Sequence, residues 1–259
     1  SMAFSRHALN QIKAILSSYS GSTSQSKPCY LPILSKHDFQ SAFNFSKKQK
    51  QVKGNQTPTP TEKNPFHESV IALSVASAAV LVPICLVDGE PSIIFTLRSG
   101  AVGSHKHQIS FPGGHVDAKD ASIVDTALRE MEEEVRGSLD YRQDVEILGR
   151  TGDVPSVTGT IVTPILAALH RNFRDTDDFH QVFHNPCEAE VEKVFFRTVK
   201  DLCSSETSEV LERFKERESP LFPGVDGNIW GLTAVILRPI LHEVLIPVFH
   251  RRNNPRNRL

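Results

Sequence analysis

The stretch FPGGHVDAKDASIVDTALREMEEEVRG, residues 111–137, joins a tight glycine turn to a segment crowded with glutamates. Apolar residues recur in it at spacings of three and four, which predicts a helix over 121–136 with one buried face. Asp120 or Ser122 can cap the first turn of that helix, because both side chains accept hydrogen bonds from free backbone N–H groups. The stretch therefore predicts a turn followed by an amphipathic helix.

Three glutamates of this helix, Glu130, Glu133 and Glu134, are spaced i, i+3 and i+4, so we expect their carboxylates to converge. Like charges held together in a partly covered site repel, and a divalent cation relieves that repulsion. Carboxylate oxygens suit Mg²⁺ or Mn²⁺. Arg129 can hold the Glu133 carboxylate in one rotamer. An acidic helix face alone is more often a solvated surface, but the Gly113-Gly114 turn favours a metal site because it lets a backbone carbonyl approach the cation.

The composition is ordinary for a soluble globular chain. The 259 residues carry a formal net charge of −1, with 39% hydrophobic and 23% charged residues. This balance provides no basic surplus, so we expect no nucleic-acid partner. The four cysteines are widely spaced and form no Cys-x-x-Cys pair, which argues against a structural zinc site or a disulfide framework and fits a reducing compartment.

An uncharged run from Ser69 to Val87 is about as long as a membrane helix. Serines and Pro83 interrupt this run, and the turn sequence Asp88-Gly89-Glu90-Pro91 follows it, before a second apolar run. The pattern is therefore interpreted as a lead-in and a buried strand, and we expect no membrane partner.

The chain divides by composition into residues 1–65, a folded domain over 66–250, and a basic tail over 251–259. The first part is basic and serine-rich, and Asp38 is the only acidic residue among its first 60. Its opening segment can form an amphipathic helix, so it resembles in composition a mitochondrial transit peptide; a disordered basic tail is the alternative. Residues 54–65 are typical of a linker. Mitochondrial localisation is the prediction, with the cytoplasm and the peroxisome as alternatives.

The folded domain alternates apolar runs with a few helical patterns, which predicts an α/β fold with helices packed on a mixed β-sheet. The predicted strands are Ala78–Val87, Ile93–Arg98, Val145–Arg150, Ile161–Leu169 and Val191–Phe196. Besides 121–136, helices are predicted from Thr198 to Cys203 or further, and from Gly231 onward.

The glutamate-rich helix resembles the Nudix box, a glycine and an acidic position followed by Arg-Glu, an aliphatic residue, any residue, Glu-Glu, any residue and glycine. The second half of that pattern is matched by Arg129, Glu130, Met131, Glu133 and Glu134. The resemblance implies a Nudix-type α/β/α sandwich with a mixed β-sheet. It also implies that the three glutamates are metal ligands or water activators, and that the Gly114 carbonyl is a further ligand.

Two positions depart from this pattern. Ala121 falls where the upstream acidic residue belongs, and Asp120 lies one residue earlier. Arg136 stands at the closing glycine, and Gly137 comes one residue late. The first departure is a slip that a variable turn can absorb. The second either weakens the helix C-cap, because Arg is unfavourable in the left-handed conformation that glycine adopts there, or lengthens the helix by one residue.

The preceding segment, FTLRSGAVGSHKHQISFPGG over residues 95–114, resembles the extra signature of the coenzyme A diphosphatase branch of the family. The residues that fit are Thr96, Arg98, Ser99, His105, Gln108 and the FPGG turn, whereas His107 stands where the branch has glycine. The similarity spans about Ala78 to Leu237 and is greatest to the mitochondrial type. It implies Mg²⁺- or Mn²⁺-dependent hydrolysis of coenzyme A and acyl-coenzyme A, with 3′,5′-ADP and (acyl-)4′-phosphopantetheine as products.

A basic patch beside the glycine turn fits such a substrate, which carries a diphosphate and a 3′-phosphate. Arg98, His105 and Lys106 are the predicted phosphate-binding residues, with His107 beside them. Arg98 can bind a phosphate through two N–H groups. A solvated strand end is the alternative for Arg98.

Catalysis needs a group that takes a proton from the attacking water, and Glu133 or Glu134 can do so. Arg129 would support these carboxylates. Members of the family also use a distal glutamate, for which Glu190 is the candidate here; Glu188 and Glu192 are equally well placed in the sequence.

Two other functions stay open. A Nudix hydrolase of another nucleoside diphosphate derivative would share the metal site without any use for a 3′-phosphate. A non-catalytic Nudix-fold binding protein is favoured by Arg136 and His107, but the presence of all three key glutamates argues against it. The expected partner is a small molecule, coenzyme A or a derivative, and a homodimer is left as an open expectation.

Overall fold

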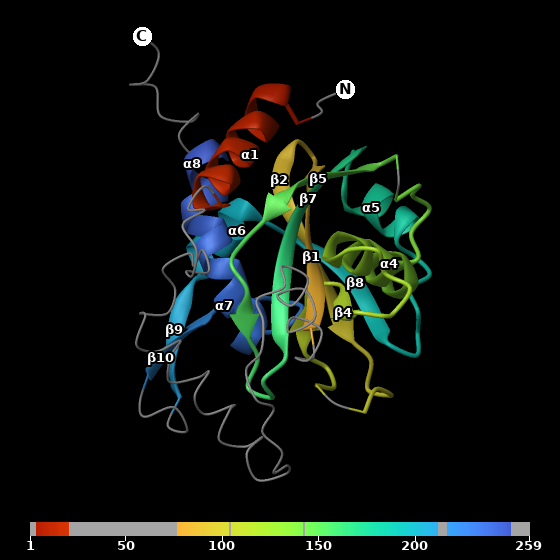
Figure 1. Cartoon of the computed structure of the whole chain (residues 1–259). Helices are drawn as coiled ribbons and strands as arrows, with labels where there is room; N and C mark the ends of the chain where they lie inside the picture. Colours follow the sequence, from red (N-terminus) through yellow and green to blue (C-terminus); the bar gives the residue numbers. More distant parts are fainter. Residues whose placement is uncertain (1–3, 21–76, 104, 142, 212–216, 250–259) are drawn as a thin grey trace, which may run out of the picture.

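The computed structural model describes residues 4–20, 77–103, 105–141, 143–211 and 217–249 (Figure 1). The strands are β1 (Ser77–Val87), β2 (Glu90–Arg98), β3 (Ile109–Ser110), β4 (Gly113–His115), β5 (Val145–Arg150), β6 (Val154–Pro155), β7 (Ile161–Phe173), β8 (Val191–Thr198), β9 (Thr207–Leu211) and β10 (Arg217–Leu221). The helices are α1 (Arg6–Ser20), α4 (Ile123–Val135), α5 (Thr176–Val182), α6 (Val199–Ser205), α7 (Gly231–Pro239), the π-helix η3 (Ile240–Leu245) and α8 (Ile246–Phe249).

The main sheet contains eight strands and is mixed. The central order is β3-β2-β1-β7-β5, while β8 pairs with β2, β4 with β1, and β6 with β7. Strands β1 and β7 are parallel, and the other pairs are antiparallel. Asp88 and Gly89, both at positive φ, form the tight turn between β1 and β2, as the Asp-Gly signal predicts. This hairpin confirms the interpretation of Ala78–Val87 as a buried strand.

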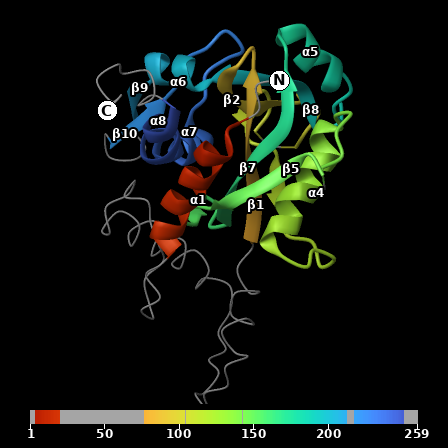
Figure 2. The same ribbon diagram turned by 90° about the horizontal axis from the view of Figure 1, so that it is seen from above.

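Two layers of helices cover the two faces of the sheet. Helices α4 and α5 lie on one face, and α6, α7, η3, α8 and α1 lie on the other (Figures 1 and 2). Each face has its own apolar core: one cluster includes Met131 and Phe179, and the other includes Phe95 and Leu241. The predicted Nudix-type α/β/α sandwich with a mixed sheet is confirmed.

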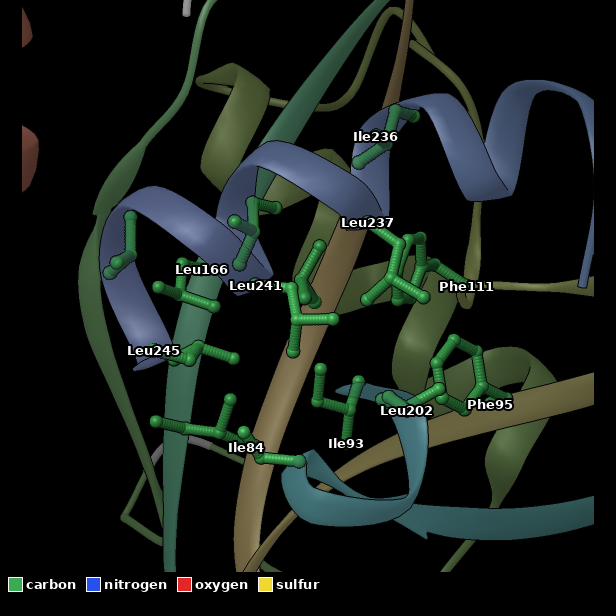
Figure 3. Packing of buried hydrophobic residues seen from close by; sticks show 14 of the residues in the cluster. Ile84, Ile93, Phe95, Phe111, Leu166, Leu202, Ile236, Leu237, Leu241 and Leu245 are labelled. Atoms are coloured by element: carbon green, nitrogen blue, oxygen red, sulfur yellow. The ribbon is translucent and has the colours of Figure 1, made fainter. Parts of the chain in front are cut away.

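The C-terminal helical run supplies much of the second core. In Figure 3, Leu237, Leu241 and Leu245 point toward strands β1, β2 and β7. The π-helix begins directly after Pro239, which has no N–H to donate to the preceding turn. Within the described part of the chain, the run Gly231–Phe249 is the one helix long and apolar enough to cross a membrane, and half of its apolar window is buried inside the fold.

The five predicted long strands are all present, and β7 continues four residues beyond the predicted end at Leu169. Helix α1 lies against β5, η3 and α8, so the described part of segment 1–65 packs on the domain. The predicted linker over 54–65, the start of the domain near Phe66 and the tail over 251–259 lie outside the described residues.

Candidate active site

Helix α4 begins and ends at the residues that the sequence singles out. Ser122 is the N-cap, and its side chain accepts a hydrogen bond from the backbone N–H of Asp125 at 3.2 Å. The helix stops at Val135, and Arg136 adopts the left-handed conformation at φ 45° and ψ 36°. The helix is therefore not lengthened. Arg136 takes the glycine conformation itself, at a cost of about 1–2 kcal/mol.

The apolar face of α4 fixes which side chains reach the glycine turn. Ala127, Met131 and Val135 are fully buried against the sheet. Next to them β4 pairs with β1, with Ala79 opposite Gly114. A Cβ atom added to Gly114 would lie 2.5 Å from the Glu130 carboxyl carbon. Only glycine allows the main chain and this carboxylate to approach so closely.

Glu134 is the most buried acidic residue of the site, with its side chain 3% exposed. The backbone N–H of Gly113 donates a hydrogen bond to Glu134 Oε2 at 3.2 Å, and Arg98 Nη1 lies 3.9 Å from Oε1. Burial raises the pKa of Glu134 to about 8, and the nearby carboxylates of Glu130 and Glu190 add to this rise. The Gly113 N–H group and Arg98 act in the opposite direction without overcoming the effect of burial.

Arg129 joins the other two glutamates. Its Nη1 donates to Glu130 Oε1 at 2.9 Å and to Glu133 Oε2 at 3.1 Å, so the contact expected between Arg129 and Glu133 is present. The side chain of Glu130 is 14% exposed, and burial raises its pKa. Glu133 is 58% exposed. The structure therefore places Glu130 and Glu134 at the glycine turn and leaves Glu133 at its outer edge.

Asp120 is a site residue that the sequence indicated only as a possible helix cap and as a departure in spacing; the cap is Ser122. Arg129 donates to both of its carboxylate oxygens, from Nε and Nη2, at 2.9 Å each. Thr126 Oγ1 also donates to Asp120 at 2.8 Å. The Arg129 guanidinium holds the pKa of this nearly buried carboxyl well below its usual range. The turn before α4 thus absorbs the extra residue, and Asp120 fixes the orientation of Arg129.

Arg98 lies at the end of β2, facing α4. Its Nε atom is buried and has no hydrogen-bond partner within the part of the chain that the structure describes. A guanidinium that approaches Glu134 and keeps a free donor has the capacity to bind a further anion.

The loop from Ser99 to Gln108 carries the other predicted phosphate-binding residues. Backbone hydrogen bonds from Arg98 N to Gln108 O (3.0 Å) and from His107 N to Arg98 O (3.1 Å) close this loop. His105 and His107 both have positive φ. His107 therefore adopts a backbone conformation that glycine would adopt more readily. Lys106, between them, is exposed. The side chain of His105 pairs with Gln108 instead, with Nδ1 2.8 Å from Oε1. Within the described part of the chain, Arg98 is the member of the predicted set that reaches the glutamates of α4.

The structure distinguishes the three candidates for a distal glutamate. The charge of Glu190 raises the pKa of both Glu130 and Glu134, so its carboxylate lies near them. Glu192 instead pairs with His107, with Oε2 3.0 Å from Nδ1. Glu188 is exposed.

Main-chain hydrogen bonds connect the Glu190 loop to helix α4. Cys187 N donates to Glu134 O at 2.9 Å, and Glu190 N donates to Cys187 O at 2.8 Å. On the other side, Ser99 N donates to Glu190 O at 2.8 Å. Glu190 is thereby held between α4 and the end of β2, near Arg98.

The donor set suits a hard divalent cation in its chemistry. Glu130 and Glu134 have raised pKa values because burial disfavours their charged forms and other carboxylates lie nearby, and a bound cation would offset this negative charge. Their oxygens and the adjacent Gly114 main chain are all hard ligands. Among the described residues, no three His, Cys, Asp or Glu side chains are already grouped as a metal site. Arg129 occupies part of the space around Glu130 and Glu133.

Comparison with known proteins shows the family of the chain. The NUDIX domain model matches residues 76–222. The Nudix hydrolase NudL of Photorhabdus laumondii is 36% identical over 65% of this chain and 85% of its own length. The mitochondrial coenzyme A diphosphatase NUDT8 of Mus musculus is 33% identical over 68% of this chain and 81% of its own. A crystal structure of a C. elegans Ap4A hydrolase is 20% identical, with a TM-score of 0.37, over 50% of this chain and 85% of that one. Since the domain model covers more than half of the sequence, the chain belongs to the Nudix hydrolase family.

Proposed function

We propose that this protein hydrolyses the diphosphate bond of coenzyme A and acyl-coenzyme A, giving 3′,5′-ADP and (acyl-)4′-phosphopantetheine. The observation that carries the proposal is the position of Arg98 at the glycine turn. Its Nη1 atom lies 3.9 Å from Glu134 Oε1, and its buried Nε atom has no hydrogen-bond partner among the described residues. An anionic diphosphate bound by Arg98 would therefore lie at the acidic face of α4. The similarity to NUDT8 supports coenzyme A as the source of that diphosphate.

Mg²⁺ or Mn²⁺ would be held by Glu130, Glu134 and the Gly114 carbonyl, with Glu133 at the edge, and would neutralise phosphate charge and acidify a water molecule. The protein residues around it have separate tasks. Asp120 orients Arg129, and Arg129 in turn holds Glu130 and Glu133.

Proton transfer is assigned to Glu134 or Glu190, of which Glu134 is buried and Glu190 is exposed. Without a metal, burial raises the pKa of Glu134 to about 8. A cation held by this carboxylate would favour its charged form, which can accept a proton. Glu190 lies close enough to affect its ionisation and is the second candidate for the base. Arg98 would donate hydrogen bonds to the diphosphate oxygens and so orient the phosphorus atom for attack.

The basic loop 105–107 offers a basis for choosing coenzyme A over other diphosphates. The loop closes on Arg98, and Lys106 is exposed beside it. A lysine in this position would bind a second phosphate attached to the same nucleotide, such as the 3′-phosphate of coenzyme A.

A substrate panel with product identification tests the proposal. Coenzyme A, dephospho-coenzyme A and ADP-ribose would be compared in Mg²⁺ and in Mn²⁺. We expect the highest kcat/KM for coenzyme A, with 3′,5′-ADP as product, and a loss of that preference in Lys106→Ala. The matched control is Lys200→Ala, an exposed lysine on α6 in the opposite helical layer. Faster hydrolysis of ADP-ribose than of coenzyme A would identify a Nudix hydrolase of another diphosphate.

We also propose that the protein acts in mitochondria. The acid-poor, basic composition of its first 60 residues and the mitochondrial location in the name of NUDT8 support this. A fusion of residues 2–60 to a fluorescent reporter should accumulate in mitochondria. Diffuse cytoplasmic fluorescence would contradict the proposal.

A further inference from the structure

Helix α1 buries one complete face in the same core that joins the sheet to the C-terminal helices. The side chains of Ala8, Leu9, Ile12 and Leu16 are at most 3% exposed, whereas Asn10 and Gln11 are exposed. Burial this complete is equal to that of the central strands. The face belongs to one continuous cluster with residues of β5, η3 and α8, among them Leu148, Leu241, Leu245 and Val248.

Ion pairs fix the rotation of the helix on this surface. Glu146 of β5 accepts from Arg6 Nη1 at 2.8 Å and from Lys13 Nζ at 2.7 Å. His170 Nε2, on β7, lies 3.0 Å from the same carboxylate. Arg6 and Lys13 are two helical turns apart and therefore lie on one side of α1. A rotation of the helix that exposed its apolar face would also separate both cations from Glu146.

The sheet is shaped to receive the helix closely. A Cβ atom added to Gly149 of β5 would lie 3.0 Å from Leu16 Cδ1, so a larger residue at this position would push α1 away. At the other end of the helix, the rings of Phe4 and Phe249 lie with centroids 5.7 Å apart. Contacts at both ends and along the middle thus hold the entire buried face.

We infer that residues 4–16 are a permanent part of the catalytic domain, and that any processing of the N-terminal segment leaves them in place. Removing the helix would expose the apolar side chains of β5, η3 and α8 to water, and the unpartnered surface would destabilise the domain. A basic amphipathic helix that directs import would on this account be retained by the mature protein. The inference rests on packing alone and is independent of the proposed reaction.

The first test separates the helix covalently while keeping the whole chain. A protease recognition sequence is placed between residues 54 and 65 of the full-length protein, which is cut after purification and passed over a gel-filtration column. We expect the N-terminal fragment to co-elute with the domain. The double variant Leu9→Ala/Ile12→Ala should release it, and the control Asn10→Ala/Gln11→Ala should not. Release of the fragment from the unsubstituted protein would overturn the inference.

The second test uses the uncut protein. Leu9→Ala should lower Tm by about 4–20 °C, as expected for a buried leucine in a domain of this size, and Asn10→Ala should leave Tm within about 2 °C. Equal Tm values for the two variants would contradict the role of α1 as a core element. An intact mass of the protein isolated from its own cells that begins after Leu16 would also overturn the inference.

Discussion

Changing the pH during metal binding tests the buried state of Glu134. This carboxyl group has a pKa of about 8 because its burial disfavours the charged form, against an ordinary value of 4.5. At pH 7 a group with that pKa holds about 0.9 of a proton, by the ordinary titration relation. A cation bound to the carboxylate must displace this proton, so binding should release about 0.9 H⁺ at pH 7 from Glu134.

The sign and size of the pH dependence follow from that proton. Protonation competes with metal binding below pH 8, so the apparent affinity should rise about tenfold for each pH unit from pH 6 to pH 7. Near pH 8 the increase should level off. Any proton displaced from Glu130, whose pKa is also raised, would add to the release.

The assay is calorimetric titration with Mn²⁺ at pH 7 in two buffers of different ionisation enthalpy, repeated at pH 6. Glu134→Gln should release about 0.9 H⁺ fewer per bound Mn²⁺ at pH 7, since glutamine has no proton to displace. Glu132→Gln, which changes an exposed glutamate of the same helix, should retain the full release. Affinity that is equal at pH 6 and pH 7, or proton release in Glu134→Gln as large as in the unsubstituted protein, would refute the reasoning.

Further predictions concern backbone conformation, close approach and charge. Arg136→Gly should raise the free energy of unfolding by about 1 kcal/mol in chemical denaturation, because glycine adopts the left-handed conformation without strain; an unchanged midpoint would contradict this. Gly114→Ala should lower kcat about 100-fold or more with the fold intact by circular dichroism, since its methyl group would displace Glu130, while Gly103→Ala, in open space, should behave as the unsubstituted enzyme. Asp120→Asn should lower the free energy of unfolding by about 1–2 kcal/mol at pH 7 by weakening the charged hydrogen bonds from Arg129. The native pKa of Asp120 is depressed, so this contribution is present above the ordinary value of 3.8 and is lost as the pH falls below it; a difference that is constant down to pH 2 would argue against the ion pair. Finally, the raised native pKa of Glu134 should lower the stability of the metal-free protein as the pH rises from about 5 to 8, by up to about 1.4 kcal/mol per pH unit. A stability that instead rises over this interval in Glu132→Gln, but not in Glu134→Gln, would contradict this prediction.

Local sequence signals predicted the long elements of the fold. The helix of residues 123–135 has its cap and its apolar spacing within one short stretch, and the strand at 77–87 is bounded by an Asp-Gly turn. Short elements were not predictable in this way. Strands β3, β4 and β6 contain two or three residues each, and they exist because distant strands pair with them. The burial of α1 depends equally on surfaces far along the chain.

In the candidate site, too, some features follow from local sequence and others from contacts between distant parts of the chain. The spacing of Glu130, Glu133 and Glu134 placed them on one helix, but their unequal burial depends on where β4 and Arg129 lie. Glu190 could not be separated from Glu188 and Glu192 by sequence position. The hydrogen bonds of its loop to α4 and to Ser99, which join residues far apart in the chain, bring it near Glu130 and Glu134.

The most direct measurement is the Mg²⁺-dependent release of 3′,5′-ADP from coenzyme A by the unsubstituted enzyme and by Glu134→Gln and Glu132→Gln. We predict that Glu134→Gln lowers kcat about 100-fold or more while retaining its fold, and that Glu132→Gln keeps full activity. Equal turnover by Glu134→Gln and Glu132→Gln would show that the buried Glu134 of α4 takes no part in the reaction.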